Sequence, residues 1–396
     1  MSRRGVAGFR FGGIHCGIKS RGLDLALIAS EEPAAWAGVF TQSSVVGAPV
    51  TWSRSCVTRG RGRAFLVNSG ISNVAMGKQG ERNVREMAHL AAQELGCLPG
   101  EICVASTGVI GEPLPMDRIR KGIPKVSSAL GKVGFRDAAE AIRTTDTYAK
   151  LAECEVKVAG RAVRVLGMAK GSGMVEPQMA TMLAFLVTDA AVAPAYLRRV
   201  LRRASDVSFN RVSVDGETST SDMALVLANG RAGNPVLSSD RSRGASRFRA
   251  AVDEVAIALA RDLARDGEGA TKLVDIVVTG GRTRAEAESA GRRIANSMLV
   301  KTALFGGDPN WGRILQTVGA AKVRIRLDRA TVRLGGVAVF RNGRPLGPKA
   351  RQKAQRQLRR PEIRLEIHLG TGRACAEFWT CDLSTEYVRI NAEYTT

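Results

Sequence analysis

The chain has 396 residues, more than one hydrophobic core usually organises, so its length predicts two domains or one large two-lobed unit. Its hydrophobic fraction of 44% and charged fraction of 24% are ordinary for a soluble globular protein and argue against disorder. The formal net charge of +22 raises nucleic acid as a partner, but the basic residues are dispersed and no helix-turn-helix, zinc-finger or RNA-binding pattern accompanies them. A solvated basic surface is therefore favoured over a nucleic-acid interface.

Cysteines and apolar runs indicate the compartment. The seven cysteines are an odd set without a C-x-x-C pair, which argues against a disulfide framework and against a metal site. No uncharged apolar run approaches the roughly 18 residues that span a bilayer. The start Met1-Ser2-Arg3-Arg4 is followed by glycines rather than by the apolar region of a signal peptide. We therefore expect a cytoplasmic protein that binds no membrane and no metal.

The apolar periodicity predicts a mixed α/β chain of the α+β type. The expected elements, in chain order, are a helix over residues 81–95, strands over 102–105 and 163–166, a buried strand over 182–187, a helix over 248–263, a strand over 275–279, a helix opened by a capping box of Thr283 and Glu286, and strands over 337–340 and 363–369. The turn pair Asn342-Gly343 follows the strand over 337–340. We expect the basic stretch 341–360 to be a mobile connection, and a glycine-rich turn predicts a boundary near residue 180.

The stretch over residues 170–187, KGSGMVEPQMATMLAFLV, places Thr181 between a turn and a run with the composition of a buried strand. A threonine hydroxyl needs a base, and the α-amine of an N-terminal threonine supplies one with an ordinary pKa of about 7.7–8.0. The same hydroxyl can attack the carbonyl of Ala180, so that self-cleavage between Ala180 and Thr181 creates the nucleophile. This stretch alone gives equal weight to a threonine that only begins a core strand.

Two further stretches carry candidate chemistry. Thr107 and Gly108 follow a short strand, where a hydroxyl and a glycine amide can converge on an oxyanion. Glu268 lies between two glycines after a helix end, in a position that faces either a cationic substrate or solvent. With three histidines and no metal-binding motif, a histidine triad and metal-dependent hydrolysis both have little support.

Taken together, these stretches make the chain resemble the glutamate N-acetyltransferases, also called ornithine acetyltransferases, of the cyclic arginine pathway. The matching stretches run almost end to end: GVFTQSSVVGAPV, STGVIGEPLPM, TTDT, AKGSGMVEPQMATML, FNRVSVDGETSTSD, DGEGATK, LVKTALFGGDPNWGRIL and CDLSTEYVRINAEYTT. So many ordered matches make the resemblance specific. It implies a two-lobed, DmpA-like fold of layered sheets with flanking helices.

The resemblance also implies which residues act. Self-cleavage before Thr181 would give an α fragment of residues 1–180 and a β fragment of residues 181–396, and two of each would form a heterotetramer. Thr107 and Gly108 would form the oxyanion hole. The substrate-binding residues that the resemblance implies are Thr144, Lys170, Thr181, Glu268, Asn391 and Thr396.

The reaction that the resemblance implies is a ping-pong acetyl transfer from N2-acetyl-L-ornithine to L-glutamate through an acetyl ester of Thr181. Lys170 would face the substrate α-carboxylate. Glu268 would face the ornithine δ-ammonium or help to move protons near the reacting amine. No cofactor is expected, and acetyl-CoA is left open as a second acetyl donor.

Two alternatives stay open at this point. A self-processed amidohydrolase or aminopeptidase of related fold would use the same Thr181 but pass the acyl group to water. A non-catalytic basic protein that binds nucleic acid would keep an intact chain and show steeply salt-dependent binding. The high net charge is the feature that keeps the second alternative under consideration.

Overall fold

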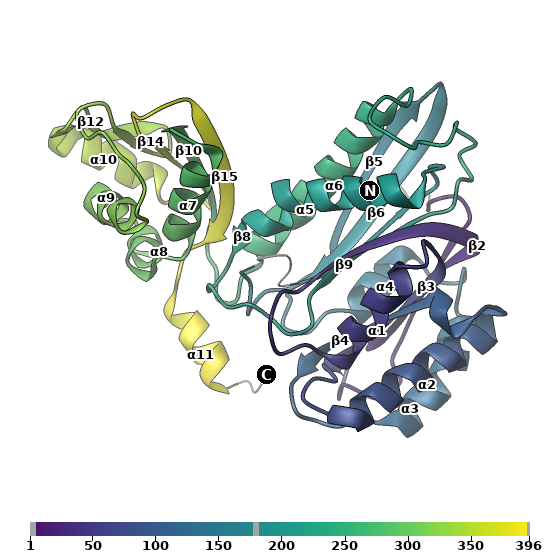
Figure 1. Ribbon diagram of the computed structural model, residues 1–396. Helices are drawn as coiled ribbons and strands as arrows, with labels where there is room; N and C mark the ends of the chain where they lie inside the picture. Colours follow the sequence, from purple (N-terminus) through teal and green to yellow (C-terminus); the bar gives the residue numbers. More distant parts are fainter. Residues whose placement is uncertain (1–4, 177–181, 394–396) are drawn as a thin grey trace.

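The computed structural model describes residues 5–176 and 182–393, which form two lobes that are each built on one β-sheet (Figure 1). Within these residues no helix has the length and apolar character needed to cross a membrane. The first lobe contains β1 (Phe9–Ile14), β2 (Leu25–Phe40), α1 (Ala48–Val57), β3 (Arg61–Ile71), α2 (Gly77–Leu95), η1 (Pro99–Glu101), β4 (Ile102–Val109), α3 (Met116–Ser128), α4 (Phe135–Ala141), β5 (Lys150–Val158), β6 (Arg161–Lys170), β7 (Leu183–Thr188), α5 (Pro194–Val207), η2 (Phe209–Arg211), β9 (Met223–Ala228) and α6 (Ala245–Arg265).

The first sheet has the strand order β4-β3-β2-β9-β7-β6-β5, with β1 added beside β2. Its strands are mostly antiparallel, but β7 runs parallel to β9 and β3 runs parallel to β4. All six residues of β7 are buried, because this strand lies inside the sheet with helices over both faces. The buried strand expected over residues 182–187 is thereby confirmed as a central strand.

Helices cover both faces of the first sheet. On one face Leu186 of β7 belongs to the same apolar cluster as Val255 and Leu259 of α6. On the other face the ring of Phe185 packs against Phe65 of β3, with ring centroids 5.5 Å apart. In a further cluster α2 packs over β3 and β4, and α3 packs over β1 and β2. The alternation of large apolar side chains along β7 therefore builds two cores at once.

The second lobe contains the sheet β13-β12-β11-β14-β10-β15-β8, and its last strand, β8 (Val212–Ser213), lies earlier in the chain, between η2 and β9. Its other elements are β10 (Leu273–Gly281), α7 (Arg284–Ala295), α8 (Met298–Phe305), α9 (Trp311–Ala320), β11 (Thr331–Leu334), β12 (Val337–Arg341), β13 (Arg344–Pro345), α10 (Gly347–Gln357), β14 (Glu362–His368), β15 (Ala374–Cys381) and the C-terminal helix α11 (Thr385–Glu393). Trp379 and Cys381 of β15 join the cluster that contains α6, which fastens the two lobes together.

The predicted caps and turns are present. Thr283 is the N-cap of α7, where its hydroxyl accepts a hydrogen bond from the Glu286 amide at 3.2 Å. Asn342 and Gly343 both have left-handed backbone conformations, with φ of 49° and 78°, and join β12 to β13. This combination is that of the tight Asn-Gly hairpin turn.

The stretch 341–360 is not the mobile connection that its basic composition predicted. It contains the hairpin strand β13 and the helix α10, in which Ala354 is buried, and Leu358 directly after the helix is buried as well. These two residues are four apart, so they share one face of the helix, while its basic residues Lys349, Arg351, Lys353 and Arg356 are exposed. The prediction was wrong because the basic residues outnumber the two buried residues, so the helical apolar pattern is hard to see in the sequence.

The cut predicted at Ala180-Thr181 does not fall between the two lobes. The strands β6 and β7, which flank residues 171–182, are antiparallel neighbours in the first sheet, with Lys170 opposite Leu183. The segments expected as α and β fragments would therefore both contribute strands to one sheet. The division into residues 1–180 and 181–396 stays a prediction, because it concerns a covalent cut rather than a lobe boundary.

The core over β7 yields a test of the fold. We expect Leu186→Ala to lower the free energy of unfolding by about 2–5 kcal/mol, because it opens a cavity between the sheet and α6. Urea unfolding followed by circular dichroism measures the change. The exposed Leu327, changed to Ala in the same way, is the control and should shift stability by less than about 0.5 kcal/mol. Equal effects of the two substitutions would contradict the central position of β7.

Candidate active site

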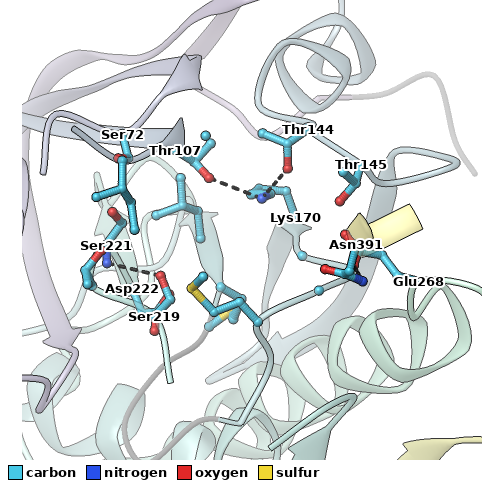
Figure 2. A pocket seen from close by; sticks show the side chains of 18 residues that line it. Ser72, Thr107, Thr144, Thr145, Lys170, Ser219, Ser221, Asp222, Glu268 and Asn391 are labelled. Atoms are coloured by element: carbon cyan, nitrogen blue, oxygen red, sulfur yellow. Dashed lines mark hydrogen bonds between the residues drawn. The ribbon is translucent and has the colours of Figure 1, made fainter. Parts of the chain in front are cut away.

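One pocket of the first lobe gathers hydroxyl, amide and charged groups from strands and loops that are far apart in the sequence (Figure 2). The helix α11, which leaves the second lobe and runs toward the first, adds one residue to it (Figure 1). Its lining residues are Ser72, Thr107, Gly108, Ile110, Thr144, Thr145, Lys170, Gly171, Gly173, Met174, Met182, Leu183, Ser219, Thr220, Ser221, Asp222, Glu268 and Asn391.

Lys170 is the last residue of β6, and its buried ammonium group lies at the centre of the polar contacts. Its Nζ donates to Thr144 Oγ1 at 2.7 Å and to Thr107 Oγ1 at 3.2 Å, as Figure 2 shows. Burial lowers the pKa of Lys170, whereas the nearby Asp146 carboxylate favours its charged form. The lysine thus holds two threonine hydroxyls in fixed positions and presents positive charge to the pocket.

A buried ion network fixes the loop that carries Thr144. Asp146 accepts hydrogen bonds from Lys150 Nζ at 2.6 Å, from the Gly171 amide at 2.7 Å and from the Thr144 amide at 3.2 Å. Lys150, which has no exposed side-chain surface, also donates to Asp266 at 2.5 Å. Burial by itself would raise the pKa of Asp146, but Lys150, Lys170 and the Gly171 amide outweigh burial and hold this pKa well below its usual range. The charge of Lys150 is therefore paired with the two carboxylates of Asp146 and Asp266.

Gly108 shows why the predicted oxyanion-hole position requires glycine. In the parallel pair of β3 and β4, Gly108 lies opposite Gly70, and its φ is +125°, a value that side chains rarely adopt. A Cβ atom here would lie 2.3 Å from the carbonyl carbon of Gly70. Thr107, the preceding residue, also lines the pocket. The hydroxyl and the glycine predicted from the sequence therefore reach the same cavity.

Glu268 and Asn391 form the acidic side of the pocket. The Glu268 amide donates to the Ser172 carbonyl at 2.8 Å, and Asn391 Nδ2 donates to Glu268 Oε2 at 2.9 Å. The backbone of Gly173 lies so close to the carboxyl group that a Cβ atom there would be 2.3 Å from Glu268 Oε2. One wall of the pocket thus presents a carboxylate, while Lys170 presents a cation (Figure 2).

Asp222 is a pocket residue that the sequence reasoning missed. Its side chain is 3% exposed, and its Oδ2 atom has no hydrogen-bond partner among the described residues. Burial raises the pKa of Asp222 well above its usual range, although Ser219 and Lys170 partly oppose this change. The only signal in the sequence is the polar run STSD directly before an apolar strand, which by itself assigns no role to Asp222.

The structure brings together six of the predicted site residues. Thr107, Gly108, Thr144, Lys170, Glu268 and Asn391 all line the one pocket. Ala180, Thr181 and Thr396 lie outside the described residues, so their predicted roles are carried forward as predictions. Met182, the residue directly after Thr181, does line the pocket. Within residues 5–176 and 182–393, no group of three His, Cys, Asp or Glu side chains is arranged to hold a metal ion.

These features define the class of protein: a two-lobed α+β enzyme whose polar pocket combines hydroxyls and a glycine amide with one buried cation and one carboxylate. Comparison with known proteins identifies the family. The sequence pattern of the ArgJ family matches residues 10–396, and the chain belongs to this family.

Individual relatives cover the whole chain. The protein from Geobacter sulfurreducens named arginine biosynthesis bifunctional protein ArgJ is 47% identical over 99% of this chain and 100% of the relative. The protein of the same name from Thermus thermophilus is 46% identical over 100% of both chains. A crystal structure of the ArgJ protein of Bacillus halodurans covers 54% of this chain and 100% of that chain, with 36% identity and a TM-score of 0.52. The recognised family and the mixed α/β fold are thereby confirmed.

The carboxyl group of Asp222 gives a pH prediction. Because its pKa is raised in the folded protein, the stability it contributes is present below the unfolded pKa of about 4 and is lost as the pH rises toward the folded value. Asp222→Asn, which cannot ionise, should remove this loss. Melting temperatures measured from about pH 4 upward should fall less steeply in the variant than in the parent. Parallel curves for the two proteins would contradict a raised pKa for Asp222.

Proposed function

We propose that this enzyme transfers the acetyl group of N2-acetyl-L-ornithine to L-glutamate, giving ornithine and N-acetylglutamate. Membership of the ArgJ family supports an acetyltransferase of arginine biosynthesis. The observation that carries the proposal is the convergence of Thr107, Gly108, Lys170 and Glu268 around the pocket that Met182 also lines. Met182 directly follows Thr181, the proposed nucleophile, in the sequence.

Maturation is the first step of the proposed mechanism. The Thr181 hydroxyl attacks the Ala180 carbonyl carbon, the C–N bond breaks, and the amine nitrogen gains the proton that the hydroxyl loses. Water then hydrolyses the resulting ester, which leaves a carboxylate on Ala180 and returns the Thr181 hydroxyl beside the α-amine that the first step freed. The downstream side is well anchored for this, because the Met182 carbonyl accepts a hydrogen bond from the Met223 amide at 3.1 Å beside the central strand β7. The products are the proposed fragments of residues 1–180 and 181–396.

Acetyl transfer then uses the same hydroxyl. The α-amine of Thr181 takes the hydroxyl proton, and the oxygen bonds to the acetyl carbon of acetylornithine. The Gly108 amide and the Thr107 hydroxyl stabilise the negative charge on the acetyl oxygen. Ornithine leaves when its amine nitrogen gains a proton, and the glutamate amine then attacks the acetyl ester and gives up a proton. Each half-reaction passes through one tetrahedral intermediate in the same pocket.

Opposite charges on the two sides of the pocket match the donor. Lys170 supplies a cation for the α-carboxylate, which both acetylornithine and glutamate carry. Glu268, held by Asn391, supplies an anion for the ornithine δ-ammonium group. The hydroxyl of Thr144 lies next to Lys170 and is placed to bind the same carboxylate, and Thr396 completes the proposed set of substrate contacts.

Several finer properties belong to this proposal. We also propose acetyl-CoA as a second acetyl donor, with no bound cofactor. We propose a heterotetramer of two α and two β fragments in the cytoplasm.

A hydrolase of related fold would instead release acetate from acetylornithine at the same rate with and without glutamate. Product analysis under both conditions separates the two reactions, and acetyl-CoA as the sole donor tests the second activity.

Removing the hydroxyl of the proposed nucleophile tests maturation. We expect Thr181→Ala to leave an intact chain and no acetyl transfer, because the substitution removes the attacking oxygen. Intact-protein mass spectrometry should show the fragment that begins at residue 181 in the parent but not in the variant. Thr181→Ser keeps a hydroxyl and is the matched control, which should still be cleaved. An uncleaved parent protein that transfers acetyl groups at full rate would contradict the proposal.

The oxyanion hole and the carboxylate should affect different kinetic constants. Thr107→Val keeps the shape of the side chain but removes its hydroxyl, so we expect kcat to fall by about 10²–10³-fold. Glu268→Gln should mainly raise KM for acetylornithine and leave KM for glutamate less changed, since only ornithine carries the δ-ammonium group. Steady-state kinetics with each substrate varied in turn measures both effects. A selective rise in the KM for glutamate in Glu268→Gln would contradict the assigned orientation.

A further inference from the structure

The carboxylate of Asp215 binds the chain just before the segment that contains the predicted cut. Its Oδ2 accepts a hydrogen bond from the Met174 amide at 2.6 Å, and its Oδ1 accepts from the Val175 amide at 2.8 Å. Oδ1 also accepts from the Glu217 amide at 3.2 Å, within the turn that follows Asp215. Two successive amides of one segment are thus held by the two oxygens of a single side chain.

Residues 174–176 have further anchors to the same turn. The Val214 amide donates to the Val175 carbonyl at 2.7 Å, and the Glu176 amide donates to the Glu217 carbonyl at 2.9 Å. Met174 has a left-handed backbone with φ of 54°, which costs free energy for a residue with a side chain. Such a conformation persists only where its surroundings impose it, and the hydrogen bonds to Asp215 supply that constraint.

Residues of the second lobe hold Glu176 and so provide a second anchor for the segment. Its Oε1 accepts a hydrogen bond from Asn296 Nδ2 at 2.7 Å and lies 3.4 Å from a guanidinium nitrogen of Arg292. Downstream, Met182 is held by its bond to the Met223 amide beside β7. The five residues 177–181 therefore connect two fixed points, Glu176 and Met182, and the predicted cut lies among them.

Asp215 also contacts the C-terminal helix. Tyr387 of α11 donates its hydroxyl to Asp215 Oδ2 at 3.3 Å. Burial raises the pKa of Tyr387, and the Asp215 carboxylate raises it further, so the phenol stays protonated as a donor. The same helix carries Asn391, which binds Glu268 in the pocket. One carboxylate thus joins the segment before the cut to the helix that contributes to substrate binding.

We propose that Asp215 is a positioning residue for self-cleavage, because it fixes residues 174–176, which lie just before the predicted cut in the sequence. This inference rests on the proposed function, because it presupposes cleavage at Ala180-Thr181. Asp215 does not contact the reacting atoms. By fixing residues 174–176, Asp215 restricts the number of conformations open to the chain between Glu176 and Met182. The attacking hydroxyl and the target carbonyl would therefore meet more often.

The test separates cleavage from catalysis. Asp215→Asn keeps the size of the side chain but replaces one acceptor oxygen with an NH₂ donor, which faces either the Met174 or the Val175 amide without a hydrogen bond. In the full-length chain we expect cleavage to slow by about tenfold or more, the factor that corresponds to one lost charge-assisted hydrogen bond. The rate of acetyl transfer per cleaved site should change by less than about threefold, because the molecules that have been cleaved retain the catalytic groups.

Two matched variants serve as controls. Glu217→Gln removes the same charge from the same turn, but its side chain is exposed, so cleavage should proceed at the parent rate. Tyr387→Phe removes only the bond to α11, so cleavage should also be unchanged, whereas KM for acetylornithine should rise because the helix that holds Asn391 is loosened. Mass spectrometry of samples taken during maturation gives the cleavage rates.

Several results would overturn the proposal. Cleavage of Asp215→Asn at the parent rate would overturn the proposal, and so would an equal slowing in Glu217→Gln. A variant whose melting temperature and activity per cleaved site fall together with cleavage would indicate a structural role and also overturn it. If Asp215→Asn does not fold, Glu176→Gln weakens the second anchor and should slow cleavage at an unchanged melting temperature; parent-rate cleavage in that variant would overturn the proposal. A parent chain that is never cleaved would refute the proposed function itself.

Discussion

The buried bonds of Lys150 to Asp146 and Asp266 are the interaction on which the pocket depends. Lys150 begins β5, Asp146 lies in the loop before it, and Asp266 ends α6, so this contact ties three elements together. These elements carry or precede Thr144 and Glu268, and the Asp146 carboxylate also holds the Gly171 amide directly after Lys170. Removing one partner of such a buried pair costs roughly 3–5 kcal/mol, because a charge is then left unpaired. The three proposed substrate-binding residues, Thr144, Lys170 and Glu268, therefore share one support.

The same contacts explain how Lys170 and Glu268 can both line the pocket without forming an ion pair with each other. The Asp146 carboxylate supplies part of the negative charge that stabilises Lys170, whose Nζ is engaged by two threonine hydroxyls. Glu268 is held by Asn391 and by its own backbone bond to Ser172. Lys170 and Glu268 therefore each have partners of their own, so the pocket holds both charges without pairing them with each other.

The sequence predicted the parts of this molecule that depend on local pattern. The six buried residues of β7 form an apolar run, and the Thr283 cap follows from the spacing to Glu286. The helix α10 escaped prediction because two buried residues four apart are a weak signal within a run of lysines and arginines. Family motifs named Glu268 and Asn391, but only folding shows that they touch. Nothing in the pattern marks Lys150 or Asp222 as buried, since burial of a charge depends on partners that are distant in the chain.

The position of the predicted cut has a structural consequence of its own. The strand β7 pairs with β6 along its whole length, and the predicted cut falls in the connection between the two strands. A break in this connection leaves the ladder of backbone hydrogen bonds intact, together with the two apolar clusters that cover it. Because β7 is bordered by β6 on one side and by β9 on the other, neither fragment would have a complete sheet alone. Each fragment would expose a long unpaired strand edge without its partner, so the fold itself favours two chains that stay together after cleavage.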